Sequence, residues 1–110
     1  MRYKSIKLKK IQREQLDILY QSLNIYALTV NMYQDFNRKL IYLDTINILQ
    51  YKIRKATELH QKVFSLSLSV AEACIIQEVI LYTVYKHPYV VMTYENFKDQ
   101  LQRELLKIEI

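Results

Sequence analysis

Glycine is absent from this 110-residue sequence, and proline occurs once, at Pro88. Because only glycine adopts positive φ at little cost, glycine helix caps and tight primed hairpin turns are excluded. We expect Asn24, Asn31 and Asn37 to take any left-handed positions, since asparagine tolerates that region. The glycine-rich phosphate loops of P-loop and dinucleotide-binding enzymes are excluded as well, which argues against a nucleotide-dependent enzyme.

Cysteine and histidine are also scarce. Cys74 is the single cysteine, so no internal disulfide can form. It falls in the most apolar stretch of the chain, where a thiol is normally inert packing. His60 and His87 have no second ligand nearby at the spacing of a metal site. We therefore expect no catalytic residue, no metal and no cofactor, and the sequence does not predict an enzyme.

Long hydrophobic runs are missing. The longest apolar stretch, residues 71–85, is interrupted by Glu72, Gln77 and Glu78, whereas a membrane span needs about 18 apolar residues or more. The basic residues 1–13 are not followed by the apolar segment of a signal peptide. We expect a soluble, intracellular (cytoplasmic) protein with no membrane partner.

The composition that remains is ordinary for a globular protein, with 51% hydrophobic and 25% charged residues. A chain of this length suits a single domain over residues 1–110. The ten tyrosines, together with abundant isoleucine, lysine and asparagine, are what AT-rich coding produces. This bias is typical of phages, mobile elements and some bacteria, and a phage or mobile-element origin is the one we expect.

Hydrophobic periodicity predicts strand and helix in the first half of the chain. Apolar and lysine residues alternate over residues 3–10, which indicates a short strand. An apolar stripe at helical spacing begins at Ile11, and Asn24 is one candidate for the end of this helix. Residues 25–32 fit a strand or a continued helix. Residues 33–60 predict a second, long helix.

The second half predicts the same order of elements. Strict alternation over Phe64–Ser69 is the clearest strand signal. Ser69 and Glu72 have the spacing of a capping box, so a helix should begin there. It should end before Pro88, because a residue that precedes proline is disfavoured in a helix. Thr93 is the expected cap of a final helix.

The two halves also resemble each other in sequence. We expect a mainly α fold of about four helices with a short two-stranded antiparallel ribbon, in which residues 3–49 and 61–110 form a pseudo-twofold strand-helix-helix repeat. The alternative is an all-helical bundle in which residues 11–60 form one or two long helices. At a shift of 58 the matching pairs are Ile6 and Phe64, Leu8 and Leu66, Glu14 and Glu72, Ile18 and Ile76, and Leu23 and Leu81; at a shift of 61 they are Tyr33 and Tyr94, Phe36 and Phe97, and Leu40 and Leu101.

Two functions from different classes fit the sequence. The favoured one is a non-enzymatic protein-protein interaction or assembly module, which binds a protein partner or forms a homo-oligomer. Its predicted interface or core residues are Phe36, Leu40, Leu43, Tyr94, Phe97 and Leu101. The alternative is a small basic nucleic-acid-binding protein with a net charge of +5. Lysines on an edge strand or on a polar helix face are also common as solvated residues that bind nothing. The predicted phosphate contacts are Arg2, Lys4, Lys7, Lys9, Lys10, Arg13, Lys52, Arg54 and Lys55.

Overall fold

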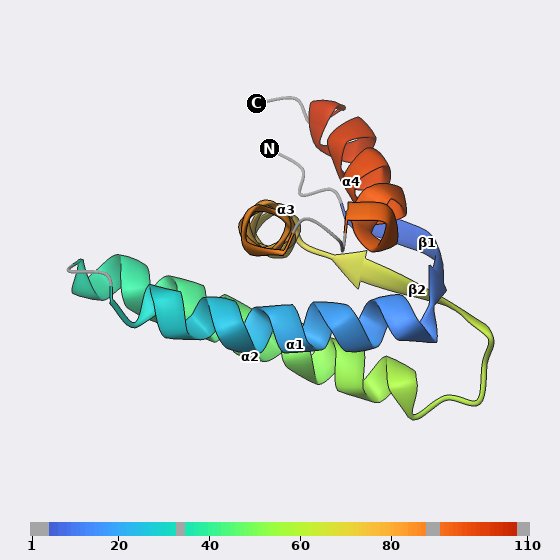
Figure 1. The fold of residues 1–110 in the computed structure, drawn as a ribbon, viewed down its shortest axis with the longest axis horizontal. Coiled ribbons are helices and arrows are strands. Elements are labelled where there is room, and N and C mark those ends of the chain that lie inside the picture. The colour runs from blue at the N-terminus through green and yellow to red at the C-terminus, as the bar shows by residue number, and fades with distance from the viewer. Residues whose placement is uncertain (1–4, 33–34, 88–90, 108–110) are drawn as a thin grey trace.

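The structure, a computed structural model, describes residues 5–32, 35–87 and 91–107, apart from the side chains of residues 91–93 and 96. The predicted mainly α fold with a two-stranded antiparallel ribbon is confirmed (Figure 1). The elements, in chain order, are β1 (Ile6–Gln12), α1 (Arg13–Val30), α2 (Phe36–Thr57), β2 (Val63–Leu68), α3 (Val70–Lys86) and α4 (Val91–Leu106).

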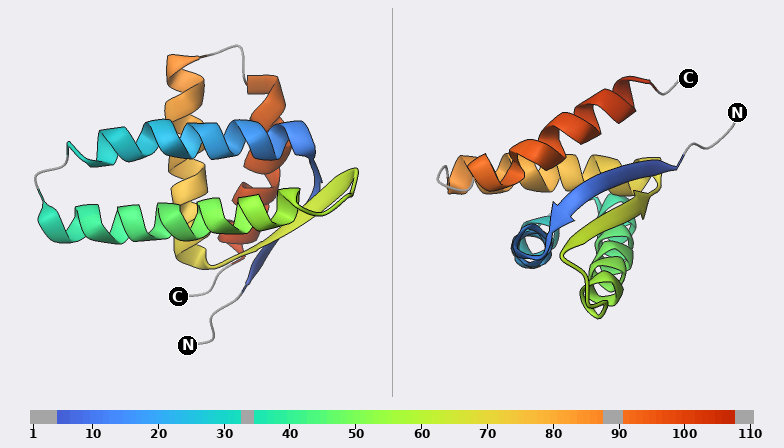
Figure 2. Two further views of the ribbon diagram at one scale, coloured as in Figure 1. Left: turned by 90° about the horizontal axis from the view of Figure 1, so that it is seen from below. Right: turned by 90° about the vertical axis from the view of Figure 1, so that its right-hand side faces the viewer.

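The helices form two hairpins that cross each other. α1 and α2 lie antiparallel, and α3 runs across both of them with α4 at its side (Figure 2, left). α4 contacts β1 and α3, while α2 contacts β2, α1 and α3. Because a two-stranded ribbon is only marginally stable alone, these helix contacts are what hold β1 and β2 in place.

The ribbon has one buried face, built from cross-strand pairs. Ile6 pairs with Leu68, Leu8 with Leu66, and Ile11 with Phe64. These side chains are all buried.

The register of the ribbon shifts between Leu8 and Ile11, where Lys10 adopts a φ of 58°. Lys10 is the only residue with positive φ in the described part of the chain. The expectation that asparagine takes such positions is therefore wrong: Asn24 and Asn37 are helical, and Asn31 has a φ of −61°.

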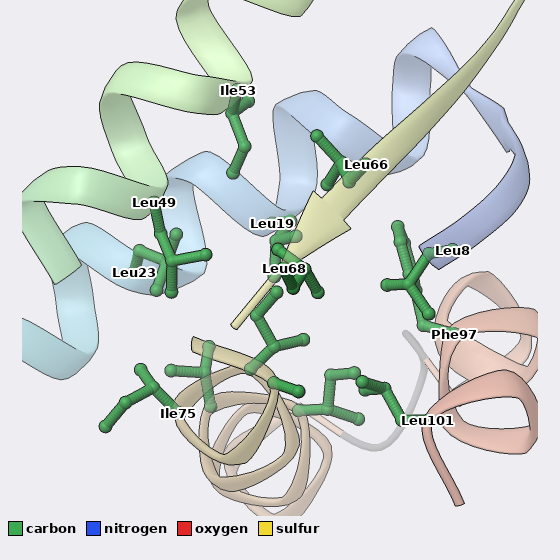
Figure 3. Close-up of a cluster of buried hydrophobic side chains, with 14 of the residues drawn as sticks. Leu8, Leu19, Leu23, Leu49, Ile53, Leu66, Leu68, Ile75, Phe97 and Leu101 are labelled. Carbon is green, nitrogen blue, oxygen red and sulfur yellow. The ribbon is translucent and has the colours of Figure 1, made fainter. Parts of the chain in front are cut away.

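A single core joins the ribbon to all four helices. Side chains from both strands meet side chains from each helix in one apolar cluster (Figure 3). The residues labelled there are Leu8, Leu66 and Leu68 of the ribbon, Leu19 and Leu23 of α1, Leu49 and Ile53 of α2, Ile75 of α3, and Phe97 and Leu101 of α4. Each hairpin buries its apolar stripe against the other hairpin and the ribbon.

Of the two alternatives for residues 25–32, the continued helix is the one that forms. α1 runs past Asn24 to Val30, because Tyr26 and Val30 extend its buried stripe. The predicted cap of the final helix is wrong. α4 begins at Val91, so Thr93 lies inside the first turn and is not the residue that precedes the helix. The predicted end of α3 is confirmed at Lys86, and Pro88 lies outside the described residues.

Both halves have the order strand, helix, helix, but the correspondence between α1 and α3 differs from the predicted one. The predicted match pairs Leu23 with Leu81, yet Leu23 is buried and Leu81 is 59% exposed. A shift of 57 matches buried residues with buried residues: Leu16 with Ala73, Leu19 with Ile76, and Leu23 with Ile80. The extra residue of the β1 bulge accounts for the change from 58 to 57. The pseudo-twofold repeat itself stays a prediction.

Candidate nucleic-acid interface

The outer face of the ribbon is exposed and basic. Lys7 and Lys9 alternate with buried residues along β1, and Ser65 and Ser67 do the same along β2. In the right-hand view of Figure 2 the ribbon passes in front of α3. We call the exposed residues of this surface the ribbon face: Ser5, Lys7, Lys9, Lys10, Gln12, Val63, Ser65 and Ser67. None of them is acidic, so the charged side chains of the ribbon face are all positive.

Contacts within the ribbon order this face. Lys7 lies opposite Ser67 in the strand register. The hydroxyl groups of Ser5 and Ser67 lie 3.0 Å apart, within hydrogen-bond distance. Because the serine side chains are short, the lysines project furthest from the ribbon face. The serine hydroxyl groups can both donate and accept hydrogen bonds.

α4 fixes the backbone of β1 beside its bulge. The Oε1 atom of Gln100 accepts a hydrogen bond from the Lys9 backbone N–H at 2.8 Å. Its Nε2 atom donates to the Lys9 carbonyl oxygen, also at 2.8 Å. One amide side chain thus satisfies both polar backbone groups of Lys9, while the Lys9 side chain remains exposed.

Arg13, a predicted phosphate contact, has a structural role. Its Nη1 and Nη2 atoms donate to the carbonyl oxygens of Thr57 and Leu59, each at 2.9 Å. Its guanidinium also lies over the ring of Phe64, 5.1 Å from the centroid. Arg13 therefore joins the start of α1 to the end of α2, where unpaired carbonyls favour a cation.

Lys52 is also engaged within the fold. Its Nζ atom donates to Glu72 Oε1 at 2.7 Å and to the Ser67 carbonyl oxygen at 2.9 Å. The Glu72 side chain is 6% exposed, whereas that of Lys52 is 37% exposed. This ion pair joins α2 to the start of α3 and to the edge of β2, and it largely neutralises the charge of Lys52.

The environment of Glu72 lowers the pKa of its carboxyl group. Burial acts to raise this pKa, but the hydrogen bonds from Lys52 and from the Ser69 backbone, together with the charge of Lys52, outweigh burial. Glu72 Oε1 accepts from the Ser69 N–H at 2.7 Å, and Ser69 Oγ accepts from the Glu72 N–H at 3.1 Å. The predicted capping box is thereby confirmed. Glu72 Oε2 is buried and has no hydrogen-bond partner among the residues that the structure describes.

Arg54 and Lys55, two further predicted phosphate contacts, do not join the ribbon face. Arg54 donates to the Tyr20 hydroxyl at 3.3 Å, and Lys55 lies 3.7 Å from the Glu58 carboxylate. Arg2 and Lys4 lie outside the described residues. Of the seven predicted basic residues that the structure describes, Lys7, Lys9 and Lys10 lie together on the ribbon face, and the other four do not.

The predicted interface residues divide into buried and exposed groups. Tyr94, Phe97 and Leu101 lie in the core, and Leu43 is partly buried against it. Phe36 is 66% exposed and Leu40 is 49% exposed. Only Phe36 and Leu40 are therefore available to a partner to any large extent.

Tyr94 is a core residue with a satisfied hydroxyl group. Its hydroxyl lies 2.5 Å from Ser22 Oγ, and Ser22 Oγ also donates to the Ile18 carbonyl oxygen at 2.8 Å. Burial raises the pKa of Tyr94, and the hydrogen bond with Ser22 partly opposes this rise. The contact fixes α4 against α1 through two polar groups that have no access to water.

Sequence reasoning missed the exposed apolar residues of α1 and α2. They are Ile25, Leu28 and Met32 near the end of α1, and Ile41, Ile48 and Tyr51 on α2. The signal was present, because apolar residues recur on both sides of the 36–57 helix instead of on one stripe.

Other types of site receive little support. Cys74 is exposed on α3, so its predicted place in the packing is wrong; the buried side of α3 passes through Ala73, Ile76 and Ile80 instead. Among residues 5–32, 35–87 and 91–107, no three histidine, cysteine, aspartate or glutamate side chains are placed to bind a metal ion together. Within the same part of the chain, every helix is too short or too polar to cross a membrane.

Comparisons with protein-family models, with curated proteins and with solved structures each gave no match. A function for this protein is therefore inferred from the residues of its own chain.

Proposed function

We propose that this protein binds nucleic acid through the ribbon face, with duplex DNA as the expected ligand. The observation that carries the proposal is the division of the ribbon into two faces. One face is fully buried against the helices, and the other presents three lysines, three serines and no acidic residue. A net charge of +5 adds a general attraction to the phosphate backbone.

The dimensions of a two-stranded ribbon favour duplex DNA. Neighbouring strands lie about 4.7–4.9 Å apart, so a ribbon fits the major groove, which is about 12 Å wide. In such a complex Lys7 and Lys9 would contact phosphates or guanine edges, while Ser65 and Ser67 would form hydrogen bonds with base edges. Proteins that read DNA with a β-ribbon use strands in this way.

The test compares two double variants with equal net charge. Lys7→Gln with Lys9→Gln removes charge from the ribbon face, while Lys86→Gln with Lys98→Gln removes it from exposed positions on α3 and α4. We expect fluorescence anisotropy to show salt-dependent binding of a mixed-sequence duplex. The ribbon variant should weaken binding and reduce the slope of log K against log salt by about 1 for each phosphate that the protein no longer neutralises.

Two results would contradict the proposal. One is no binding to duplex at low salt by the unmodified protein. The other is an equal loss of affinity in the two double variants, because a general charge effect would not distinguish them. Single-stranded DNA and RNA of the same sequence, titrated in parallel, show whether the duplex is the preferred form.

A second function, protein-protein interaction and assembly, is favoured by a separate observation. Phe36 and Leu40, two of the predicted interface residues, are exposed on α2, and Leu28 of α1 and Met32, two residues beyond the end of α1, are exposed as well. Large apolar side chains left exposed in this number are typical of protein interaction sites. The molecular mass in solution tests this function independently of any nucleic acid.

A further inference from the structure

The side of α2 that faces away from the core carries a regular seam. Ile41, Asp44, Ile48, Tyr51 and Lys55 follow one another at steps of three and four residues, which is the spacing of a heptad seam. All five are exposed, with 62% for Ile41, 44% for Ile48 and 59% for Tyr51. We call these five residues the outer seam.

The outer seam is separate from the stripe that holds α2 in the fold. The buried residues of α2 are Thr45, Ile46, Leu49 and Ile53, which pack toward α1, α3 and β2. A helix that is apolar on two sides normally buries both of them. Single exposed apolar residues are common on protein surfaces, but three of them at heptad spacing on one helix indicate a helical partner.

We propose that the partner is a second copy of this chain, whose α2 packs antiparallel against the outer seam about a twofold axis. The antiparallel orientation follows from the charges of the outer seam. Asp44 lies in its first half and Lys55 at its end. Lys55 also lies 3.7 Å from the Glu58 carboxylate of its own helix, but both side chains are more than half exposed and the Lys55 ammonium can turn to a partner. A parallel, in-register pair would set Asp44 against Asp44 and Lys55 against Lys55, whereas an antiparallel pair sets opposite charges against each other.

Charge pairing also selects one register. When Asp44 lies opposite Lys55 of the second copy, Ile48 lies opposite Tyr51 of the second copy. Because a twofold interface is isologous, each of these contacts occurs twice. The paired segment of α2 spans about 16 Å, or three helical turns. The centre of the interface is thus apolar and aromatic, and each of its two ends carries one pair of opposite charges, Asp44 of one copy and Lys55 of the other.

The interface uses one helix from each copy, so its area falls at the low end of specific interfaces. We expect a dimer that dissociates on dilution. The lysines of the ribbon face lie on β1 and the outer seam lies on α2. The dimer would present two ribbon faces, but the proposal does not depend on nucleic-acid binding and is tested without nucleic acid.

Charge reversal across the outer seam gives the sharpest test. Asp44→Lys and Lys55→Asp, each alone, set like charges opposite each other in the antiparallel dimer. We expect each to raise the dimer dissociation constant about tenfold or more in sedimentation equilibrium. The double variant with both changes restores opposite charges and should return the dissociation constant to near that of the unmodified chain. In a parallel dimer the single changes only exchange one like-charge pair for another.

The controls separate the outer seam from general surface effects. Ile48→Gln should dissociate the dimer, whereas Leu106→Gln and Asp99→Lys, at exposed positions on α4, should not. Circular dichroism of every variant establishes that the fold is retained. A monomer at all concentrations, single charge reversals without effect, or a double variant that stays dissociated would each overturn the proposal.

Discussion

The two helical hairpins differ most in how their second helices bury similar residues. Phe97 and Leu101 of α4 face the core, while the residues matched with them in sequence, Phe36 and Leu40 of α2, are exposed. Tyr33, the predicted match of Tyr94, lies outside the described residues. Similar apolar spacing in two helices therefore does not mean that similar residues are buried.

The position of each helix relative to the ribbon accounts for the difference. α4 has 16 residues, and Tyr94, in its first turn, is already buried. α2 has 22 residues, and its buried apolar stripe begins only at Ile46. The first turns of α2 lie toward the end of the hairpin far from the ribbon, beyond α3 (Figure 1). Phe36 and Leu40, in these first turns of α2, are thus exposed and accessible to a partner.

The largest contrast should appear between Phe97→Ala and Phe36→Ala. Removing the fully buried Phe97 ring leaves a cavity in the shared core, so we expect the free energy of unfolding to fall by about 3–5 kcal/mol. Phe36 is mostly exposed, so Phe36→Ala should change it by less than about 0.5 kcal/mol. Urea unfolding followed by circular dichroism measures both. Equal losses would mean that Phe36 is buried in solution.

A smaller contrast lies between the two strand-to-helix junctions. At the start of α1 the Gln15 side chain accepts from the Gln12 N–H at 2.9 Å, and both groups are neutral. At the start of α3 the Glu72 carboxylate takes the same place and also binds Lys52. The two capping contacts have the same local geometry, but only the one at the start of α3 includes a charged group, the Glu72 carboxylate.

Glu72→Gln and Gln15→Ala test this contrast. At neutral pH we expect Glu72→Gln to lower the free energy of unfolding by about 1–2 kcal/mol, because the charged hydrogen bond with the partly exposed Lys52 is lost. Gln15→Ala should lower the free energy of unfolding by about 0.5–1 kcal/mol, which is typical of the loss of a neutral capping contact. Thermal and urea unfolding at several pH values measure both differences.

The pH dependence separates these two variants further. The pKa of Glu72 is lowered in the folded protein from an ordinary value of 4.5. Its contribution to stability is therefore fully present above that value, and it is lost as the pH falls through the lower pKa of the folded state. The difference between the unmodified protein and Glu72→Gln should shrink below pH 4.5. A difference that stays constant, as expected for Gln15→Ala, would show that the charge of Glu72 contributes nothing.

Features set by neighbouring residues could be predicted from the sequence. The alternation of Phe64, Leu66 and Leu68 and the spacing of Ser69 and Glu72 each depend on a few adjacent residues, and both were confirmed. The end of α3 at Lys86 is equally local. Strand period, capping and the effect of proline act over one or two turns, so the sequence alone contains their causes.

The roles of the basic residues could not be predicted, because their partners are distant in the chain. Arg13 binds carbonyl oxygens of Thr57 and Leu59, and Lys52 binds Glu72. Only the folded arrangement of α1, α2 and β2 brings these groups together. The basic residues therefore predicted the overall charge of the protein. They did not predict which basic side chains form hydrogen bonds or ion pairs within the fold.

The smallest contrast concerns two adjacent lysines of β1. Lys10 has a φ of 58°, which costs a residue with a Cβ atom about 1–2 kcal/mol. Lys10→Gly relieves this strain, and the greater chain entropy of unfolded glycine offsets part of the gain, so we expect stability to rise by about 0.5 kcal/mol. Lys9→Gly, in an ordinary extended position, should lower it by about 0.5–1 kcal/mol. Urea unfolding measures the change in the free energy of unfolding for both variants, and we expect the two changes to have opposite signs. If both variants lose the same stability, the bulge of β1 does not hold Lys10 at positive φ in solution.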